Sequence, residues 1–282
     1  MKFILITGVS TGIGYDLTKA FIKSGYHVLG SVRKSEDAER LSNEFGANFT
    51  ALLFDVTDQA AIQNSLASVK ATVGENGLAG LINNAGIALS GPTQLLPLET
   101  FRYQLEVNLF GAIAVTQTFL ELLGAKKDCP HPPGKILNIS SVSGKLAFPF
   151  LGPYNASKFA LEGWSHALRR ELLGFGIDVI IIGPGAIKTP IWDKALNADL
   201  PKEWEDTPYY RPMQRIKKEF TKQEAKAMPS EVLSNKVLKV FESSNPKTRY
   251  SFLNNKFFDF TIPSMLPDRV MDKFIKKLFK IN

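Results

Sequence analysis

The feature that most constrains the fold of this chain is an alternation of short apolar segments with longer segments of helical pattern, repeated through the first two thirds of the sequence. The apolar segments are rich in Ile, Leu and Val and do not alternate with polar residues. Such segments are typical of parallel strands that helices cover on both faces. The repeat therefore predicts an α/β fold built on a parallel sheet. The predicted strands are 3–7, 27–32, 48–54, 78–83, 135–140 and 177–182, and the predicted helices are 13–24, 35–45, 58–74, 100–124 and 153–174.

Length and composition favour a single globular domain. The chain has 282 residues, of which 44% are hydrophobic and 22% charged, enough for one well-buried domain and too few for two of full size. A single cysteine, Cys129, excludes a disulfide or a thiolate metal site within one chain and predicts a cytoplasmic location. The apolar run after Met1 is shorter than a signal peptide requires, and no window approaches a membrane span. The three histidines lack neighbouring ligands, so we predict no metal.

The net charge of +7 is carried mostly by the C-terminal third. Residues 191–282 contain 18 Lys and Arg against 12 Asp and Glu, whereas residues 1–190 contain 16 against 15. A basic surplus can attract nucleic acid or anionic lipid. This surplus is spread over some ninety residues, as in an ordinary solvated face, and we predict no nucleic-acid partner.

A glycine-rich turn follows the first predicted strand and opens the first predicted helix. It reads Thr-Gly-Val-Ser-Thr-Gly-Ile-Gly over residues 7–14. Glycines allow a tight turn and close approach to a pyrophosphate, and the N–H groups of the helix N-terminus face the anion. An ordinary Gly-rich turn is the alternative, but the position between strand and helix favours a dinucleotide site in a doubly wound, Rossmann-type sheet.

The end of the second strand bears on which dinucleotide is bound. Residues 28–34 read Val-Leu-Gly-Ser-Val-Arg-Lys and include no carboxylate to hold the 2′-hydroxyl of NAD. Arg33, with Lys34 and Thr11 nearby, suits a 2′-phosphate instead. We therefore predict that NADP(H) is preferred over NAD(H); the alternative is that Arg33 only opens a solvated loop.

Tyr154 and Lys158 are spaced to lie on one face of a predicted helix. An ammonium near a phenol stabilises the phenolate and is expected to lower the pKa of the tyrosine, making it a usable general acid or base. Tyr15 and Lys19 have the same spacing but directly follow the glycine turn. The hydroxyl-rich segment 138–144 precedes Tyr154, where a serine is placed to bind a carbonyl oxygen.

Together these motifs resemble the short-chain dehydrogenase/reductase family over about residues 3–190, in order and at the family's usual spacing. Across the whole chain the resemblance is nearest to the subgroup similar to 17β-hydroxysteroid and retinol dehydrogenases, including Leu266–Arg269. The matching elements are the glycine motif at 7–14, the adenine contact Asp55-Val56, NNAG at 83–86, NxxG at Asn108 and Gly111, Ser141 thirteen residues before Tyr154 of YxxxK, and PGxxxT at 184–189.

The resemblance implies a catalytic tetrad and a set of cofactor contacts. Asn108 would hold a relay water, Ser141 would orient the substrate oxygen, Tyr154 would pass the proton, and Lys158 would bind the nicotinamide ribose while tuning Tyr154. Ser140 and Ser143 are also hydroxyls here, and only the interval to Tyr154 selects Ser141. In the family, Asn83 is a backbone brace, which leaves Asn84 as the cofactor contact. The implied cofactor-binding residues are Gly8, Ser10, Thr11, Gly12, Ile13, Gly14, Arg33, Asp55, Val56, Asn84, Ala85, Gly86, Tyr154, Lys158, Pro184, Gly185, Ile187 and Thr189.

The region after Thr189 breaks the strand–helix rhythm. We predict an irregular, polar and aromatic stretch to about residue 228, a helix at 229–243 and a strand at 248–252. Residues 1–190 would form the dinucleotide-binding and catalytic core, and residues 191–282 a substrate lid, a final helix and strand and a basic tail of the same domain. An insertion after a strand lies at the carboxyl edge of the sheet, where ligands bind.

The substrate is predicted to be an apolar ketone or aldehyde and its alcohol. Aromatic residues of the lid and the segment before Tyr154 would form an apolar wall, although they could equally pack a core of their own. Ser141, Phe148, Tyr154 and Trp192 are the predicted substrate-binding residues. The alternative function is a non-catalytic NADP(H)-binding regulatory or scaffolding protein of the same fold.

The tail from Phe257 to Phe279 combines aromatic residues with lysines. Val270, Phe274, Ile275 and Leu278 fall on one helical stripe, which suits an anionic membrane surface. We favour packing against the chain's own domain or a partner subunit over such peripheral contact. The family resemblance implies a homodimer or homotetramer through the helices near 100–124 and 153–174.

Overall fold

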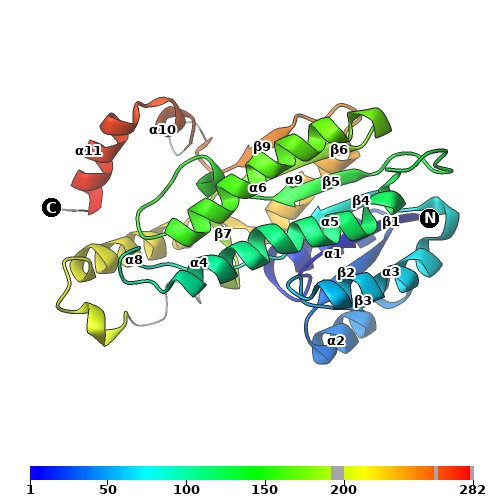
Figure 1. The fold of residues 1–282 in the computed structure, drawn as a ribbon, viewed down its shortest axis with the longest axis horizontal. Helices are drawn as coiled ribbons and strands as arrows, with labels where there is room; N and C mark the ends of the chain where they lie inside the picture. Colours follow the sequence, from blue (N-terminus) through cyan, green and yellow to red (C-terminus); the bar gives the residue numbers. More distant parts are fainter. Residues whose placement is uncertain (192–199, 257–259, 280–282) are drawn as a thin grey trace.

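The computed structural model describes residues 1–191, 200–256 and 260–279, without the side chains of 223–225. Its centre is a seven-stranded parallel sheet with strand order β3-β2-β1-β4-β5-β6-β9 (Figure 1). The order reverses between β1 and β4, which is the crossover of a doubly wound fold. The predicted α/β Rossmann-type fold is confirmed. The strands are β1 Lys2–Ile6, β2 Tyr26–Val32, β3 Phe49–Leu53, β4 Gly80–Asn83, β5 Lys135–Ile139, β6 Asp178–Pro184 and β9 Arg249–Phe252.

The sheet has a hydrophobic layer on each face, as the apolar strand segments predict. One layer packs Leu17 and Phe21 of α1 with Val237 and Phe241 of α9. The other includes Ile62 of α3, which packs beside residues of α5 and α6. Burial of both strand faces explains why the strand sequences do not alternate. The helices are α1 Gly12–Lys23, α2 Ser35–Phe45, α3 Gln59–Val73, α4 Leu98–Leu105, α5 Gly111–Phe119, α6 Gly152–Glu171 and α9 Ser230–Glu242.

The predicted helix 100–124 is interrupted. Between α4 and α5 the chain forms a π-helical turn, η3, over Glu106–Phe110. A 3₁₀ turn, Leu120–Leu123, then ends α5. Single π-helical turns inside helices often mark functional sites, and this one contains Asn108.

The stretch predicted to be irregular contains a long helix, α8, over Tyr210–Ala225. That part of the prediction is wrong, because charged residues on the outer face of α8 masked its helical pattern. A short parallel pair, β7 Ile187–Lys188 with β8 Met228–Pro229, was also not expected. It joins the segment after β6 to the segment before α9.

The C-terminal helices α10 (Ile262–Met265) and α11 (Asp268–Phe279) lie beyond the carboxyl ends of the strands, apart from the sheet (Figure 1). Phe279 is buried, and its carbonyl accepts a 3.5 Å hydrogen bond from Arg215 of α8. Of the predicted stripe, Val270, Phe274 and Leu278 are exposed and Ile275 is half-buried. Among the described residues, no helix is long and apolar enough to cross a membrane.

Candidate active site

The glycine turn between β1 and α1 has the backbone that the sequence predicts. Gly8 and Gly12 have φ of +70° and +59°, conformations that favour glycine. A Cβ on Gly14 would lie 2.2 Å from the carbonyl oxygen of Gly8, so no other residue fits there. Thr11, the N-cap of α1, makes no side-chain capping hydrogen bond, and the first turn has no acidic residue. This arrangement suits the diphosphate of a dinucleotide.

Residues 83–86 pack directly under the glycine turn. The Asn84 amide donates to the carbonyls of Thr7 (2.8 Å) and Gly8 (3.1 Å), while the Thr7 hydroxyl accepts from the N–H groups of Asn84 and Ala85. Asn83 donates to Thr116 and Asn138. The Asn84 side chain therefore braces the backbone of the glycine turn, whereas Asn83, to which the sequence assigned that role, hydrogen-bonds to side chains of α5 and β5.

Two arginines follow β2, Arg33 directly after the strand and Arg40 on α2. Arg33 is largely exposed, and its Nη1 is 3.7 Å from the Asp55 carboxylate. Arg40 of α2 donates from Nη2 to the Ser10 carbonyl at 2.8 Å. The sequence identified Arg33 but missed Arg40, because an arginine on a helix surface has no local pattern that connects it with the glycine turn. Arg40 thus lies beside the glycine turn, where it also pairs with Asp37 at 2.8 Å and Glu44 at 3.9 Å.

The segment after β6 returns to the glycine turn. A Cβ on Gly12 would lie 3.3 Å from Cβ of Thr189. Ile187 is buried in β7, and the N–H of Gly185 donates to Phe252 of β9 at 2.9 Å. Residues 184–189 therefore lie at the carboxyl edge of the sheet, close to the first turn of α1.

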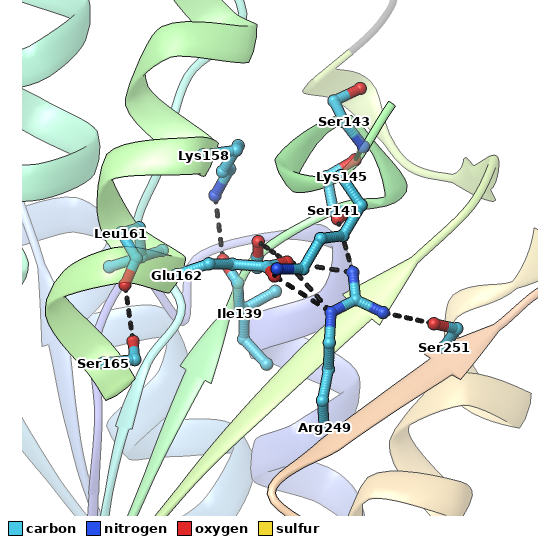
Figure 2. A network of polar contacts seen from close by, with 11 residues as sticks. Ile139, Ser141, Ser143, Lys145, Lys158, Leu161, Glu162, Ser165, Arg249 and Ser251 are labelled. Carbon is cyan, nitrogen blue, oxygen red and sulfur yellow. Dashed lines mark hydrogen bonds and ion pairs between the residues drawn. The ribbon is translucent and has the colours of Figure 1, made fainter. Parts of the chain in front are cut away.

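Ser141, Tyr154 and Lys158 come together at the end of β5 and the start of α6. Ser141 is the N-cap of a 3₁₀ turn, η5 (Val142–Gly144), and its Oγ accepts from the N–H of Ser143 at 3.1 Å. Tyr154 and Lys158 are both buried, and Lys158 Nζ lies 5.7 Å from the Tyr154 ring centroid. Lys158 Nζ donates to the carbonyl of Ile139 at 2.8 Å (Figure 2).

Burial dominates the ionisation of this pair. It raises the pKa of Tyr154 to about 12, although the hydrogen bond with Ser141 acts to lower it. The expectation that Lys158 brings the pKa of Tyr154 below its ordinary value is therefore not met in the free protein. Burial also lowers the pKa of Lys158 to about 8, against the opposing charge of Glu162. At neutral pH Tyr154 is a neutral phenol that retains a proton to donate.

Asn108 lies in the π-helical turn and is buried. Its Oδ1 accepts from the N–H of Ile87 at 2.9 Å. Its Nδ2 donates to the Ile87 carbonyl at 3.0 Å and to Ser157 Oγ at 3.1 Å. Asn108 therefore ties the loop after β4 to α6, next to Lys158.

An apolar cluster surrounds Tyr154. Ala88 and Leu151 are its buried neighbours, and Phe148, Ile191 and Phe220 pack against them. Phe148 thus lies where the sequence predicted, and Phe220 brings α8 to the site. Trp192, also predicted to bind substrate, lies outside the described residues.

The loop before Tyr154 has a strained backbone. Phe150 has φ of +62°, which is rare for a bulky residue. Its ring contacts Tyr209 with centroids 6.2 Å apart, and the Tyr209 hydroxyl donates to Gln94 at 2.7 Å. The segment before α8 is therefore attached to the loop that precedes Tyr154. Among the described residues, no group of three His, Cys, Asp or Glu side chains is placed to hold a metal ion.

Comparison with known proteins identifies the relatives of this chain. The family model described as short chain dehydrogenase matches residues 2–199. An NADPH-dependent 3-dehydrocapnine reductase from Ornithobacterium rhinotracheale is 40% identical, over 100% of this chain and 99% of its own length. The 17-beta-hydroxysteroid dehydrogenase type 6 of Bos taurus is 34% identical, over 98% of this chain and 88% of its own length. A closed serine dehydrogenase structure complexed with NADP+ has a TM-score of 0.75 at 25% identity, over 89% of this chain and 94% of that one.

Proposed function

Because this chain belongs to the short-chain dehydrogenase/reductase family, and is an oxidoreductase of that class, we propose that it interconverts an apolar ketone or aldehyde and its alcohol with NADP(H). The observation that carries the proposal is the grouping of Ser141, Tyr154 and Lys158 beside an apolar cluster. A non-catalytic NADP(H)-binding protein has no use for a buried phenol hydrogen-bonded to a serine, so we do not favour that alternative.

The residues support proton transfer at the substrate oxygen. In the direction of reduction, the Ser141 hydroxyl orients the carbonyl oxygen and the neutral phenol of Tyr154 donates its proton to it. Lys158, held by the Ile139 carbonyl, stabilises the phenolate that this transfer leaves behind. Asn108 keeps the loop after β4 and α6 together, and we assign it to the relay that returns the proton. NADPH, when bound, supplies the hydride.

The cofactor preference rests on the charge beside the glycine turn. Arg33 and Arg40 give this edge two guanidinium groups, which suit the 2′-phosphate of NADP(H). The 3-dehydrocapnine reductase that matches the whole chain is NADPH-dependent, and the serine dehydrogenase structure was solved in complex with NADP+. The remaining contacts we propose are those of the glycine turn, Asp55-Val56, residues 84–86 and residues 184–189.

The apolar substrate class rests on the surroundings of Tyr154. Phe148, Leu151 and Phe220 present hydrocarbon rather than charge to the phenol. The natural substrates of the relatives differ from one another by name, so we propose a chemical class and no single compound.

We also propose that the protein is a homodimer or homotetramer. Tyr103, Phe110 and Phe159 lie on α4, η3 and α6 and are 44% to 51% exposed. Exposed aromatic residues on neighbouring helices suit a symmetric contact between copies. Light scattering of the purified protein should give a mass of two or four chains, and a monomer at micromolar concentration would contradict this.

Replacement of Tyr154 by Phe tests the catalytic proposal. The variant should lose turnover with a panel of apolar ketones and aldehydes by roughly 10²–10⁴-fold or more, because the proton donor is gone. NADPH affinity, measured by fluorescence titration, should be nearly unchanged. Retained turnover would exclude Tyr154 as the donor. Failure of the wild-type protein to oxidise NADPH with any panel member would reject the proposed reaction.

Titration with NADPH and NADH tests the cofactor proposal. The wild-type protein should bind NADPH more tightly, and Arg33→Asp should reverse or abolish the preference by removing one guanidinium and adding a repelling carboxylate. Arg102→Gln, an exposed change on α4, is the matched control and should leave both affinities unchanged. A wild-type preference for NADH would overturn the proposal.

A further inference from the structure

One turn of α6 beyond Lys158 lies Glu162, whose carboxylate is almost completely buried, at 1% exposure. An ionised carboxylate is costly to remove from water unless charged and hydrogen-bonding partners compensate. Residues buried in this way need a structural explanation, and the reaction described above does not use Glu162.

The main partner of Glu162 is Arg249 at the start of β9 (Figure 2). Arg249 Nε donates to both carboxylate oxygens at 3.1 and 3.0 Å, and Nη2 donates to Oε1 at 2.9 Å. Ser140 Oγ donates to the same oxygen at 2.9 Å. Lys145 Nζ lies 3.4 Å from Oε2 on the solvent side. The ion pair is therefore fully hydrogen-bonded and joins α6 to the last strand of the sheet.

Two glycines make space for this pair. A Cβ on Gly144 would lie 2.6 Å from Glu162 Oε1. A Cβ on Gly183 of β6 would lie 2.5 Å from Nη2 of Arg249. The Glu162 carboxylate is thus enclosed by η5 and the Arg249 guanidinium by β6. A larger residue at either glycine would displace them.

The pair connects with the catalytic residues through the end of β5. Three consecutive residues there are each held by a different charged side chain. Lys158 donates to the Ile139 carbonyl, Ser140 donates to Glu162, and Arg249 Nη2 donates to the Ser141 carbonyl at 3.2 Å. Figure 2 shows the contact of Lys158 with Ile139 and that of Arg249 with Ser141.

We propose that Glu162 and Arg249 are positioning residues of the reaction, an ion pair that fixes residues 139–141 and so holds the Ser141 hydroxyl and the Lys158 ammonium in place. The inference deepens the proposed function and rests on it. Arg249 lies outside residues 2–199, the part of the chain that the family model matches. The last strand would therefore contribute to the active site through this contact.

The pair also has an electrostatic consequence. The negative charge of Glu162 raises the pKa of Lys158 against the effect of burial. The titratable and charged groups that face Glu162 are Lys158 and His166 on its own helix, Lys145 after η5, and Arg249 on β9. Removal of the carboxylate should therefore lower the pKa of Lys158 further, so that the ammonium loses its proton at lower pH.

The test compares Glu162→Gln and Arg249→Lys with the wild-type holoenzyme. In Glu162→Gln, kcat should fall about tenfold, KM should stay within about threefold, and the alkaline limb of the reduction profile should move down by roughly half a pH unit or more. Arg249→Lys keeps the charge but not the forked hydrogen bonds. It should lower kcat with a smaller displacement of the limb. Asp272→Asn, an exposed carboxylate of α11, is the control and should change neither quantity.

A second readout does not depend on activity. The ¹³Cε signal of Lys158, assigned by its loss in Lys158→Met, should titrate at lower pH in Glu162→Gln than in the wild type. If thermal melting shows that either single variant is unfolded, the double variant Glu162→Gln/Arg249→Gln, which removes both charges together, is measured in its place. An alkaline limb and a Lys158 titration that match the wild type would overturn the inference. Absence of Tyr154-dependent turnover in the wild type would instead overturn the proposed function. In that case the titration of Lys158 would still show whether Glu162 raises its pKa.

Discussion

Two tyrosine–lysine pairs in this protein have the same spacing and different surroundings. Lys19 Nζ lies 5.6 Å from the Tyr15 ring centroid, and Lys158 Nζ lies 5.7 Å from that of Tyr154. Tyr15 of α1 is half-buried, and its hydroxyl donates to Glu44 in a hydrogen bond that raises the pKa of Tyr15. Tyr154 is buried and hydrogen-bonded to Ser141. The distance within each pair therefore does not distinguish Tyr15 from Tyr154, the proposed proton donor, whereas burial and the third partner do.

The largest difference between the pairs should appear when each lysine is replaced. Lys158→Met should lower kcat/KM for carbonyl reduction by roughly 10³-fold, because the phenolate of Tyr154 loses its stabilising charge. Lys19→Met removes an equivalent contact at the surface and should change kcat/KM less than about twofold. Steady-state kinetics of the two variants measures this. Equal losses in both would show that the two pairs are functionally alike.

Replacement of the third partner should have the next largest effect. Ser141→Ala should lower kcat by about 10²-fold, as is usual when a donor to the reacting oxygen is removed. Ser143→Ala is the control for a nearby hydroxyl, since Ser143 contacts Ser141 through its backbone N–H. Glu44→Ala, which removes the partner of Tyr15, should leave kcat unchanged. A larger loss in Ser143→Ala than in Ser141→Ala would contradict the assignment of Ser141.

The stability of the protein at high pH should reflect the raised pKa of Tyr154. The unfolded chain loses this phenolic proton near its ordinary pKa of 10.0, whereas the folded protein keeps it to about 12. The contribution of Tyr154 is therefore complete below pH 10 and is lost as pH rises to 12, by up to roughly 2–3 kcal/mol. Urea unfolding at pH 9.5, 10.5 and 11.5 should show a smaller decline for Tyr154→Phe than for the wild type. Parallel declines would place Tyr154 in a more polar setting than the structure does.

The smallest effect is expected at Tyr15. Tyr15→Phe removes one exposed hydrogen bond to Glu44, and the free energy of unfolding at pH 7 should fall by less than about 1 kcal/mol. Turnover should match the wild type. Chemical unfolding and a single kinetic assay are sufficient, and a large loss of activity would make Tyr15 part of the site.

Prediction from the sequence was most accurate where the structure is local. Each strand and the glycine turn depend on residues close together in the chain, and all seven predicted strands were confirmed. The helix α8 was missed because its exposed face is highly charged, and the π-helical turn at Asn108 was missed because the hydrophobic pattern continues through it. The placement of the cofactor and substrate residues follows the motifs, and their contacts with ligands remain predictions.

The sequence by itself determined that Ser141 and Lys158 lie close to Tyr154. The reason is that the motif spacing places Ser141 after β5 and Lys158 one helical turn after Tyr154 on α6. Only the tertiary structure decided that Tyr154 is a buried, neutral phenol with a raised pKa, because desolvation depends on everything that surrounds the ring. It also decided that Arg249, 87 residues from Glu162, hydrogen-bonds both to Glu162 and to the Ser141 carbonyl after β5. That contact exists because β9 pairs with β6, and no pattern near either residue specifies this pairing.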